Sequence, residues 1–255
     1  MSIENKNKLN YLLQQTKQGG VLFSAWMSAK GYSNQLQKKY RDSAWLTALS
    51  VGVMYRTGDS LRSFPVLESY NSQLGKNYHI AALSALELAG FNHYVPMGKP
   101  ILMIKHPKQE PVPAWMKNLD LDYSLKFFST ETFSKSQYAL FSKDYPHVQA
   151  SVPEQAFLEC LLLAPEHYSY MDLYYIMEQL TTLRPNVVQE LLENTSNLKV
   201  KRLFLYMAEK AKHYWFELLN FEKIKLGTGK HQLVENGIYV PKYKITVPKE
   251  LYDYE

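Results

Sequence analysis

The segment "SNQLQKKYRDSAWL", residues 33–46, carries amide, lysine and arginine side chains at spacings that could read DNA. On a helix, with about 100° per residue, these polar side chains fall on one side: Asn34, Gln37, Lys38 and Arg41. Leu36 and Tyr40 fall on the opposite side. Amides pair with the edge of adenine, and Arg or Lys reaches guanine acceptors or phosphates, so these residue types suit the major groove. An ordinary solvated helix face has the same composition, and the neighbouring segments must decide between the two.

Two further helices are predicted before this segment. Leucines at helical spacing, followed by the Gly19-Gly20 pair, indicate a first helix that ends before residue 19. Ser24 is a candidate N-cap for a short second helix that Gly31 ends, and Ser33 is a candidate N-cap for the third. The short turn between the second and third helices gives the connectivity of a helix-turn-helix.

A β-hairpin is predicted after the third helix. Two short strands, 44–49 and 53–57, flank a turn at residues 50–52. Three helices followed by a hairpin are typical of a winged helix-turn-helix, in which segment 33–46 is the recognition helix. Arg56, on the second strand of the wing, is then a candidate phosphate contact.

The positive charge of the chain is concentrated in its first quarter. The net charge of the whole chain is +5, and residues 1–70 hold nine Lys and Arg side chains against four acidic ones. Such an excess is typical of a nucleic-acid-binding module joined to a neutral domain, although a role in solubility gives the same composition. We therefore expect a DNA-binding domain in 1–70 and a second domain in 71–255. Without an apolar run of about 18 residues or a signal peptide, the expected location is cytoplasmic.

Residues 71–255 are predicted to form a larger mixed α/β domain with a helical second half. Pro65 and the polar "NSQLGKN" indicate a linker or the approach to a second domain. A helix ended by Gly90 and strands in "KPILMIKH" and "YSLKFFSTETF" are expected after it. From about residue 151 the periodicity indicates four helices. On the last of them, basic side chains and Leu205 lie off the apolar stripe, as a solvated face or as a docking surface.

No motif of catalysis or metal binding was found. The seven histidines have no metal-ligand spacing, and "GTGKHQ" lacks the first glycine and the Ser or Thr of a phosphate-binding loop. Cys160 lies in the apolar run "AFLECLLLA", which favours a buried structural thiol. We therefore expect no catalytic residue, no metal site and no cofactor.

Several segments occur together in an order that is more specific than any one of them. They are "LLQQTKQGGVLFSAWMSAKGYSNQLQKKY", "WLTALSVGVMYRTGD", "SALELAGFNHYVPMG", "PAWMKNL", "PEQAFLECLLLAPE", "MEQLTTLRPNVVQELLE", "KVKRLFLYMAEKAKHYWFELL" and "LGTGKHQLVENGIYVPKYKITVPKEL". With them the chain resembles, over nearly its whole length, the AbiEi family of bacterial antitoxins, in the subgroup with an N-terminal winged helix.

The resemblance implies the antitoxin of a type IV toxin–antitoxin, or abortive infection, system used in phage defence. Such a protein is a transcriptional repressor that binds operator DNA, expected as inverted repeats upstream of its own operon. Its C-terminal domain counteracts a nucleotidyltransferase toxin without necessarily forming a stable complex. Carried over by position, the DNA-binding residues are Ser33, Asn34, Gln35, Gln37, Lys38, Arg41 and Arg56. The basic C-terminal segment implicated in antitoxicity maps onto Lys199, Lys201 and Arg202.

The wing departs from the family pattern, and other functions remain open at this point. Family wings often carry basic residues at the hairpin, where this chain has "ALSVGVMY". One alternative function is an enzyme, with a nuclease-like or nucleotidyltransferase-like C-terminal domain that the winged helix directs to its target. Another is a transcriptional regulator whose C-terminal domain senses a small ligand.

Overall fold

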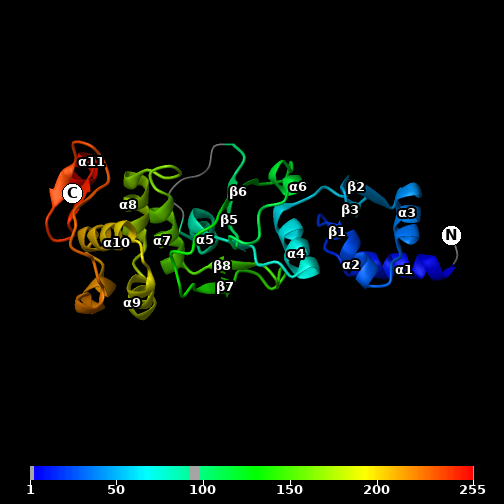
Figure 1. Ribbon diagram of the computed structural model, residues 1–255, viewed down its shortest axis with the longest axis horizontal. Coiled ribbons are helices and arrows are strands. Elements are labelled where there is room, and N and C mark those ends of the chain that lie inside the picture. The colour runs from blue at the N-terminus through cyan, green and yellow to red at the C-terminus, as the bar shows by residue number, and fades with distance from the viewer. Residues whose placement is uncertain (1–2, 92–97, 255) are drawn as a thin grey trace. The chain divides into compact units, whose positions relative to one another are not determined.

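The computed structural model describes residues 3–91 and 98–254, and the chain forms two compact units (Figure 1). The first unit comprises residues 1–79, 96–129 and 140–149, and the second comprises residues 80–95, 130–139 and 150–255. Helices and strands occur in both units, which confirms the predicted mixed α/β class. Among the described residues, no helix is both long and apolar enough to cross a membrane.

The first unit begins with three helices and a hairpin, here called the N-terminal module (residues 3–57). Its elements are α1 (Ile3–Gln14), β1 (Leu22–Phe23), α2 (Ser24–Ala29), α3 (Asn34–Asp42), β2 (Leu46–Ser50) and β3 (Val53–Arg56). The strands form an antiparallel sheet in the order β1-β3-β2. The helix–helix–hairpin order is the one expected for a winged helix, and β1 adds a third strand. A small core fills its interior: Leu9, Leu12, Leu22, Met27, Tyr32, Tyr40, Leu46 and Met54.

The predicted linker around Pro65 is wrong, because a helix lies there. Helix α4 (Ser63–Leu74) is largely buried, and Gly75 ends it in a left-handed conformation (φ +62°). Pro65 is tolerated because it lies in the first turn, where backbone N–H groups have no partner within the helix. The predicted boundary at residue 70 falls inside this helix. Two side chains of α4 hydrogen-bond to the backbone at β1. Ser69 accepts from the backbone N–H of Val21, and Gln73 accepts from the N–H of Phe23 and donates to the carbonyl of Val21.

The two strands predicted in "KPILMIKH" and "YSLKFFSTETF" are present, but they belong to the first unit, whereas the sequence placed them in the second domain. Strand β5 (Ile101–Lys105) pairs in register with β6 (Ser124–Phe128). The short helix α6 (Ala114–Lys117) lies between them in the sequence. Asp122 lies in the segment just before β6, and its carboxylate accepts from the backbone N–H and the hydroxyl of Ser63 at 2.7 Å each. This contact fixes the beginning of α4.

The second unit is mainly helical, as predicted for the chain after residue 151. Its helices are α5 (Ala82–Leu88), α7 (Pro153–Leu163), α8 (Tyr170–Gln179), α9 (Pro185–Asn194), α10 (Leu198–Lys210), α11 (Lys249–Asp253) and the 3₁₀ turns η1 (Tyr214–Leu218) and η2 (Phe221–Lys223). Strands β9 (His231–Gln232), β10 (Ile238–Val240) and β11 (Ile245–Val247) form a small sheet in the order β10-β11-β9. The unit divisions of the chain fall within β4 (His79–Ile80), β7 (Tyr138–Leu140) and β8 (Gln149–Ser151).

The core of the second unit lies around α7. Cys160 is fully buried there, as predicted for a structural thiol, and burial raises its pKa well above the ordinary value. The carboxylate of Glu154 receives two hydrogen bonds of 2.9 Å from the guanidinium of Arg184 and a third from the backbone N–H of that residue. This ion pair joins the beginning of α9 to the beginning of α7.

Candidate nucleic-acid interface

Helix α3 begins at a side-chain cap, as the sequence predicted. The hydroxyl of Ser33 accepts a 3.3 Å hydrogen bond from the backbone N–H of Leu36. This satisfies one of the N–H groups that the first turn of a helix leaves unpaired. At the other end, Ala44 adopts a left-handed conformation (φ +55°), and the backbone N–H of Trp45 bonds to the carbonyl of Tyr40. Both ends of the helix are therefore fixed by local contacts.

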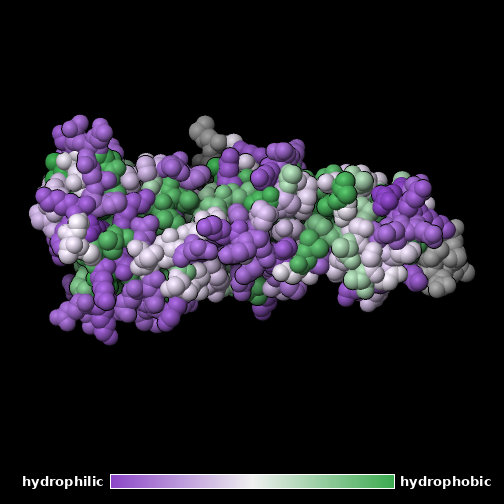
Figure 2. All heavy atoms as spheres, in the orientation of Figure 1, coloured by the Kyte–Doolittle hydropathy of each residue, from purple (hydrophilic) through white to green (hydrophobic). Residues whose placement is uncertain are grey.

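One side of α3 is open to solvent and carries polar and basic side chains. The exposed residues are Ser33, Asn34, Gln35, Lys38, Lys39 and Arg41. On the opposite side of the helix, Tyr40 is fully buried and Leu36 packs against the core, as predicted. Figure 2 shows hydrophilic residues covering the part of the N-terminal module where Figure 1 places α3. The geometry thus presents amide, ammonium and guanidinium groups together on a packed helix.

Gln37 does not belong to this open side, which corrects the prediction that it reads bases. Its side chain is 1% exposed and bonds to the turn between α2 and α3. Its amide donates to the carbonyl of Tyr32 at 2.8 Å and to the hydroxyl of Ser28 at 3.0 Å. The residue lies one turn from Ser33 and Tyr40 on the inner side of the helix, where a buried carbonyl needs a donor. Gln37 therefore fixes the angle between the two helices instead of facing a ligand.

Ser24 is the first residue of α2 and not its N-cap, which is a second correction. The cap position is Phe23, and the hydroxyl of Ser24 instead donates to the amide oxygen of Gln37 at 2.6 Å. The backbone N–H of Ser24 bonds to the carbonyl of Gly52 at 2.8 Å, in the turn of the hairpin. Ser24 thus links α2, α3 and the hairpin turn, so that the three parts of the module are positioned by one residue.

The hairpin carries little positive charge at its tip. Val51, in the turn, is fully exposed, and Gly52 beside it has a φ of +73°. Arg56 is exposed but lies at the other end of the hairpin, opposite Leu46. Arg41 of α3 reaches toward the hairpin, where its guanidinium lies 3.2 Å from the sulfur of Met54. The structure therefore brings Arg41 close to the strands and leaves Arg56 at the base of the wing.

Lys199, Lys201 and Arg202 of α10 do not form an exposed face, which corrects the predicted docking surface. Arg202 is 1% exposed, and its guanidinium donates to the carbonyls of Leu226 and Lys244. Lys201 is also buried, and Lys199 is half-buried and donates to the carbonyls of Leu162 and Ala164, the latter at 2.6 Å.

Lys199 and Arg202 have a structural role, because they donate to backbone carbonyls of the segments that pack against α10. Lys199 compensates the carbonyl end of α7, where the helix dipole favours a cation. Arg202 connects α10 to two later segments of the chain, which cover the helix. The spacing of apolar residues within α10 cannot predict this cover. Leu205, expected off the apolar stripe, is fully buried for the same reason. Burial lowers the pKa of both Lys199 and Lys201.

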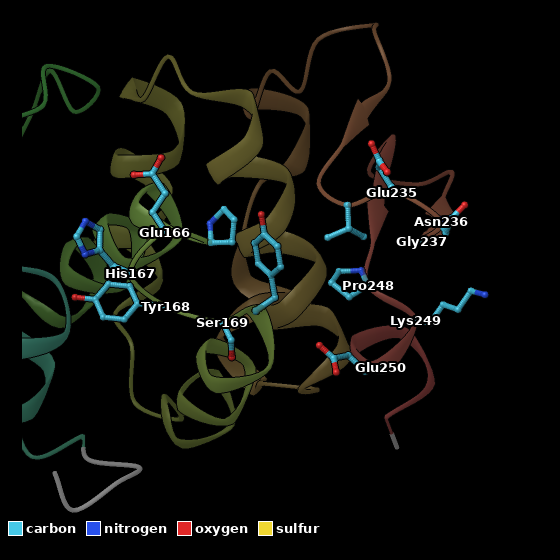
Figure 3. A pocket seen from close by; sticks show the side chains of 13 residues that line it. Glu166, His167, Tyr168, Ser169, Glu235, Asn236, Gly237, Pro248, Lys249 and Glu250 are labelled. Carbon is cyan, nitrogen blue, oxygen red and sulfur yellow. The ribbon is translucent and has the colours of Figure 1, made fainter. Parts of the chain in front are cut away.

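A cleft of about 700 Å³ opens in the second unit (Figure 3). Figure 3 shows Glu166, His167 and Tyr168 on one side of it and Glu235 and Lys249 on the other. Burial raises the pKa of Tyr168 well above its ordinary value, so its hydroxyl stays neutral. In the part of the chain that the structure describes, no group of three or more His, Cys, Asp or Glu side chains could hold a metal ion. We assign no chemistry to this cleft.

Comparisons with known proteins cover both parts of the chain. Residues 5–97 match the family model described as the AbiEi antitoxin N-terminal domain of transcriptional regulators, and residues 99–248 match that of the transcriptional regulator, AbiEi antitoxin, of type IV toxin–antitoxin systems. A search of curated proteins gave no match. Among solved structures, the RV2827C protein from Mycobacterium tuberculosis is similar, with a TM-score of 0.59 and 13% identity. The likeness covers 88% of this chain and 85% of that one, and it shows a shared fold.

Proposed function

Because the chain belongs to the AbiEi family of transcriptional regulators and type IV antitoxins, we propose that it represses its own operon and counteracts a nucleotidyltransferase toxin. Repression requires operator DNA as one partner, and antitoxicity requires the toxin as the other. The two activities are assigned to different parts of the chain. The region of residues 1–70 binds DNA, and residues 71–255 carry the antitoxin activity.

The exposed side of α3 is the observation that supports DNA binding. Asn34 and Arg41 are the residue types that read adenine and guanine edges, and Lys38 is suited to a phosphate. Ser33 and Gln35 lie at the N-terminal end of the same helix, where backbone N–H groups also favour phosphate. Because the cap of Ser33 and the bonds of Gln37 hold this helix in place, little ordering is needed on binding. Recognition is assigned to these residues.

The wing is assigned a smaller share of the affinity than in relatives with a basic hairpin. Its tip presents Val51, which adds no Coulombic attraction for phosphate. Arg56, at the base of the hairpin, is placed to contact the backbone at the edge of the site. The protein is expected to bind operator DNA through one helix and a single peripheral arginine, at inverted repeats upstream of its operon.

The antitoxin activity is assigned to the region after residue 70, with a surface other than the basic side chains of α10. Lys201 and Arg202 bond to the protein's own carbonyl groups and are covered by later segments. A macromolecule cannot reach them without unfolding that part of the unit. The toxin is countered functionally, and a stable complex is not required by this assignment.

The decisive experiment separates the two activities in the full-length protein. Operator binding is measured by gel shift with DNA from upstream of the operon, and antitoxicity by the growth of cells that express the cognate toxin. A variant with Asn34→Ala and Arg41→Ala should lose repression and still restore growth. Loss of both activities in a folded variant would contradict the division of labour. Absence of operator binding by the wild-type protein would contradict the repressor role.

A further inference from the structure

A polar groove of about 510 Å³ lies in the first unit, away from the exposed side of α3. Its walls come from the loop that follows α1, from α2 and the residue after it, from α4, and from residues 143, 144, 146 and 147. Pockets of this size accommodate small molecules. Most of the side chains that line it are polar or charged, which favours a ligand that carries charge over a wholly apolar one.

Three lysines converge on the groove from three segments that are distant in sequence. Lys17 follows α1, Lys30 follows α2, and Lys143 lies in the last segment of the unit; each is exposed. A lysine ammonium is a compact charge that suits phosphate, and three of them suit a group with more than one negative charge. The fold thus assembles a small basic site that no single segment carries.

The same groove contains an aromatic ring and groups that suit a sugar. Trp26 of α2 lines it: the indole packs partly against the core of the N-terminal module and is half-buried, so part of its aromatic surface borders the groove. Asp144 is exposed in the lining, and a carboxylate is a common partner of ribose hydroxyls. The other acidic side chain, Glu68, is already occupied: it accepts from the ring of His147 at 2.6 Å and from the backbone N–H of that residue. Both of its carboxylate oxygens therefore already accept hydrogen bonds within the wall.

We propose that this groove binds a nucleotide, with its phosphates at the three lysines and its base against Trp26. This ligand combines the planar ring, the hydroxyl groups and the negative charge that the lining can bind. DNA is a poorer candidate for the same groove, because the opposite side of α2 contacts α3 through Ser24 and Ser28. The groove therefore lies behind the helix-turn-helix, on the side of α2 that carries Trp26.

A ligand in this groove contacts the two side chains whose hydrogen bonds join α4 to the sheet of the N-terminal module. Ser69 and Gln73 line the groove, and the same two side chains bond to Val21 and Phe23 of the β1 segment. Lys30 lies two residues before Tyr32, whose carbonyl is bonded by Gln37 of α3. Nucleotide binding is thereby coupled to the position of the recognition helix, and we expect it to change operator affinity.

The test is a binding titration of the full-length protein in the absence of DNA. Calorimetry with ATP, GTP, AMP, adenosine and inorganic tripolyphosphate should give a dissociation constant below about 1 mM for at least one nucleotide. Each of the variants Lys17→Gln, Lys30→Gln and Lys143→Gln should weaken it by about two- to fivefold, and the triple variant by about tenfold or more. Lys117→Gln, at an exposed lysine of α6 outside the groove, is the matched control and should bind as the wild type does.

The outcomes separate this site from DNA binding. Equal affinity for tripolyphosphate and nucleotides would overturn the assignment of a nucleotide, and wild-type affinity in the folded triple variant would overturn the location. No binding of any probe, together with weaker operator binding by the lysine variants, would make the groove a DNA-phosphate surface and overturn the proposal. Because the titration contains no DNA, failure of the repressor role does not affect its result.

Discussion

The hydroxyl of Ser24, at the start of α2, donates a 2.6 Å hydrogen bond to the amide oxygen of Gln37 in α3. The backbone N–H of the same serine bonds to Gly52 in the hairpin turn. These contacts connect α2, α3 and the turn of the hairpin through polar groups in a small module. A glutamine, a residue type that could read adenine, instead holds in place the helix whose exposed side we propose as the DNA-binding surface.

Replacement of Gln37 tests this structural role. Gln37→Ala leaves the carbonyl of Tyr32 without its donor in a buried turn, and we expect a loss of about 2–3 kcal/mol in the free energy of unfolding. The measurement is urea denaturation followed by circular dichroism. Gln35→Ala is the matched control, since the same residue type is exposed two positions earlier and should change stability by less than about 0.5 kcal/mol. Equal, small effects of both substitutions would show that the buried amide is not needed.

Asn34 and Arg41 test the exposed side of α3. Either residue replaced by Ala should weaken operator binding by about 1–3 kcal/mol, because each removes hydrogen bonds to a base edge, while the free energy of unfolding stays nearly the same. Lys38→Ala should instead weaken binding to all DNA sequences alike and reduce the slope of log affinity against log salt by about one. Fluorescence anisotropy at several salt concentrations distinguishes the two effects. Unchanged affinity in all three variants would place the recognition surface elsewhere.

The sequence contains enough local information to predict the three helices and the hairpin of the N-terminal module, but not the burial of every side chain on them. Ser33 and Gly52 act within a few residues, and the cap and the turn that they specify are observed. Gln37 was misplaced because a helical projection cannot show which carbonyls the preceding turn leaves unpaired. The composition around Pro65 is typical of a linker, although a proline in the first turn is also compatible with a helix, which is what the structure has.

The features that the sequence does not predict in the rest of the chain depend on contacts between distant segments. The guanidinium of Arg202 is buried and bonds to carbonyl groups that lie 24 and 42 residues later in the chain. No pattern within α10 therefore distinguishes Arg202 from a solvated arginine. The groove behind α2 has the same character. Its lysines are supplied by three separate segments, one of them in residues 140–149, and no local spacing unites them.

Arg202 provides the test of the buried cation. Arg202→Leu removes charged hydrogen bonds to two carbonyl groups and leaves both unpaired, so we expect a loss of about 3 kcal/mol or more in the free energy of unfolding. Lys230→Leu, at an exposed lysine of the second unit, should have an effect below about 1 kcal/mol. Thermal denaturation of both variants gives the comparison. If Arg202→Leu is as stable as the control, the guanidinium is not a structural connection and its role in a partner surface must be reconsidered.

The ion pair of Glu154 and Arg184 should make the free energy of unfolding depend on pH. Burial alone raises the pKa of Glu154, but the hydrogen bonds from Arg184 outweigh it, and the pKa lies below the ordinary value of 4.5. A carboxyl group whose pKa is lower in the folded state stabilises the protein above its unfolded pKa, and this contribution disappears as the pH falls through the folded pKa. The difference in unfolding free energy between wild type and Glu154→Gln should therefore shrink as the pH is lowered from 7 toward and below 4.5. Urea denaturation at a series of pH values measures it, and a constant difference would contradict this sign.

The apolar wing tip permits a gain-of-affinity test. Val51 is fully exposed and precedes a glycine with positive φ, so a lysine at this position costs little stability. If the hairpin lies beside the DNA backbone, Val51→Lys should tighten operator binding at low salt and increase the magnitude of the slope of log affinity against log salt by about one, because one more phosphate is neutralised. Val51→Ser, which changes polarity without charge, should leave both quantities unchanged. A lysine variant with the affinity and slope of the wild type would mean that the tip does not approach phosphate, and that the contacts of the operator are confined to α3 and the base of the hairpin.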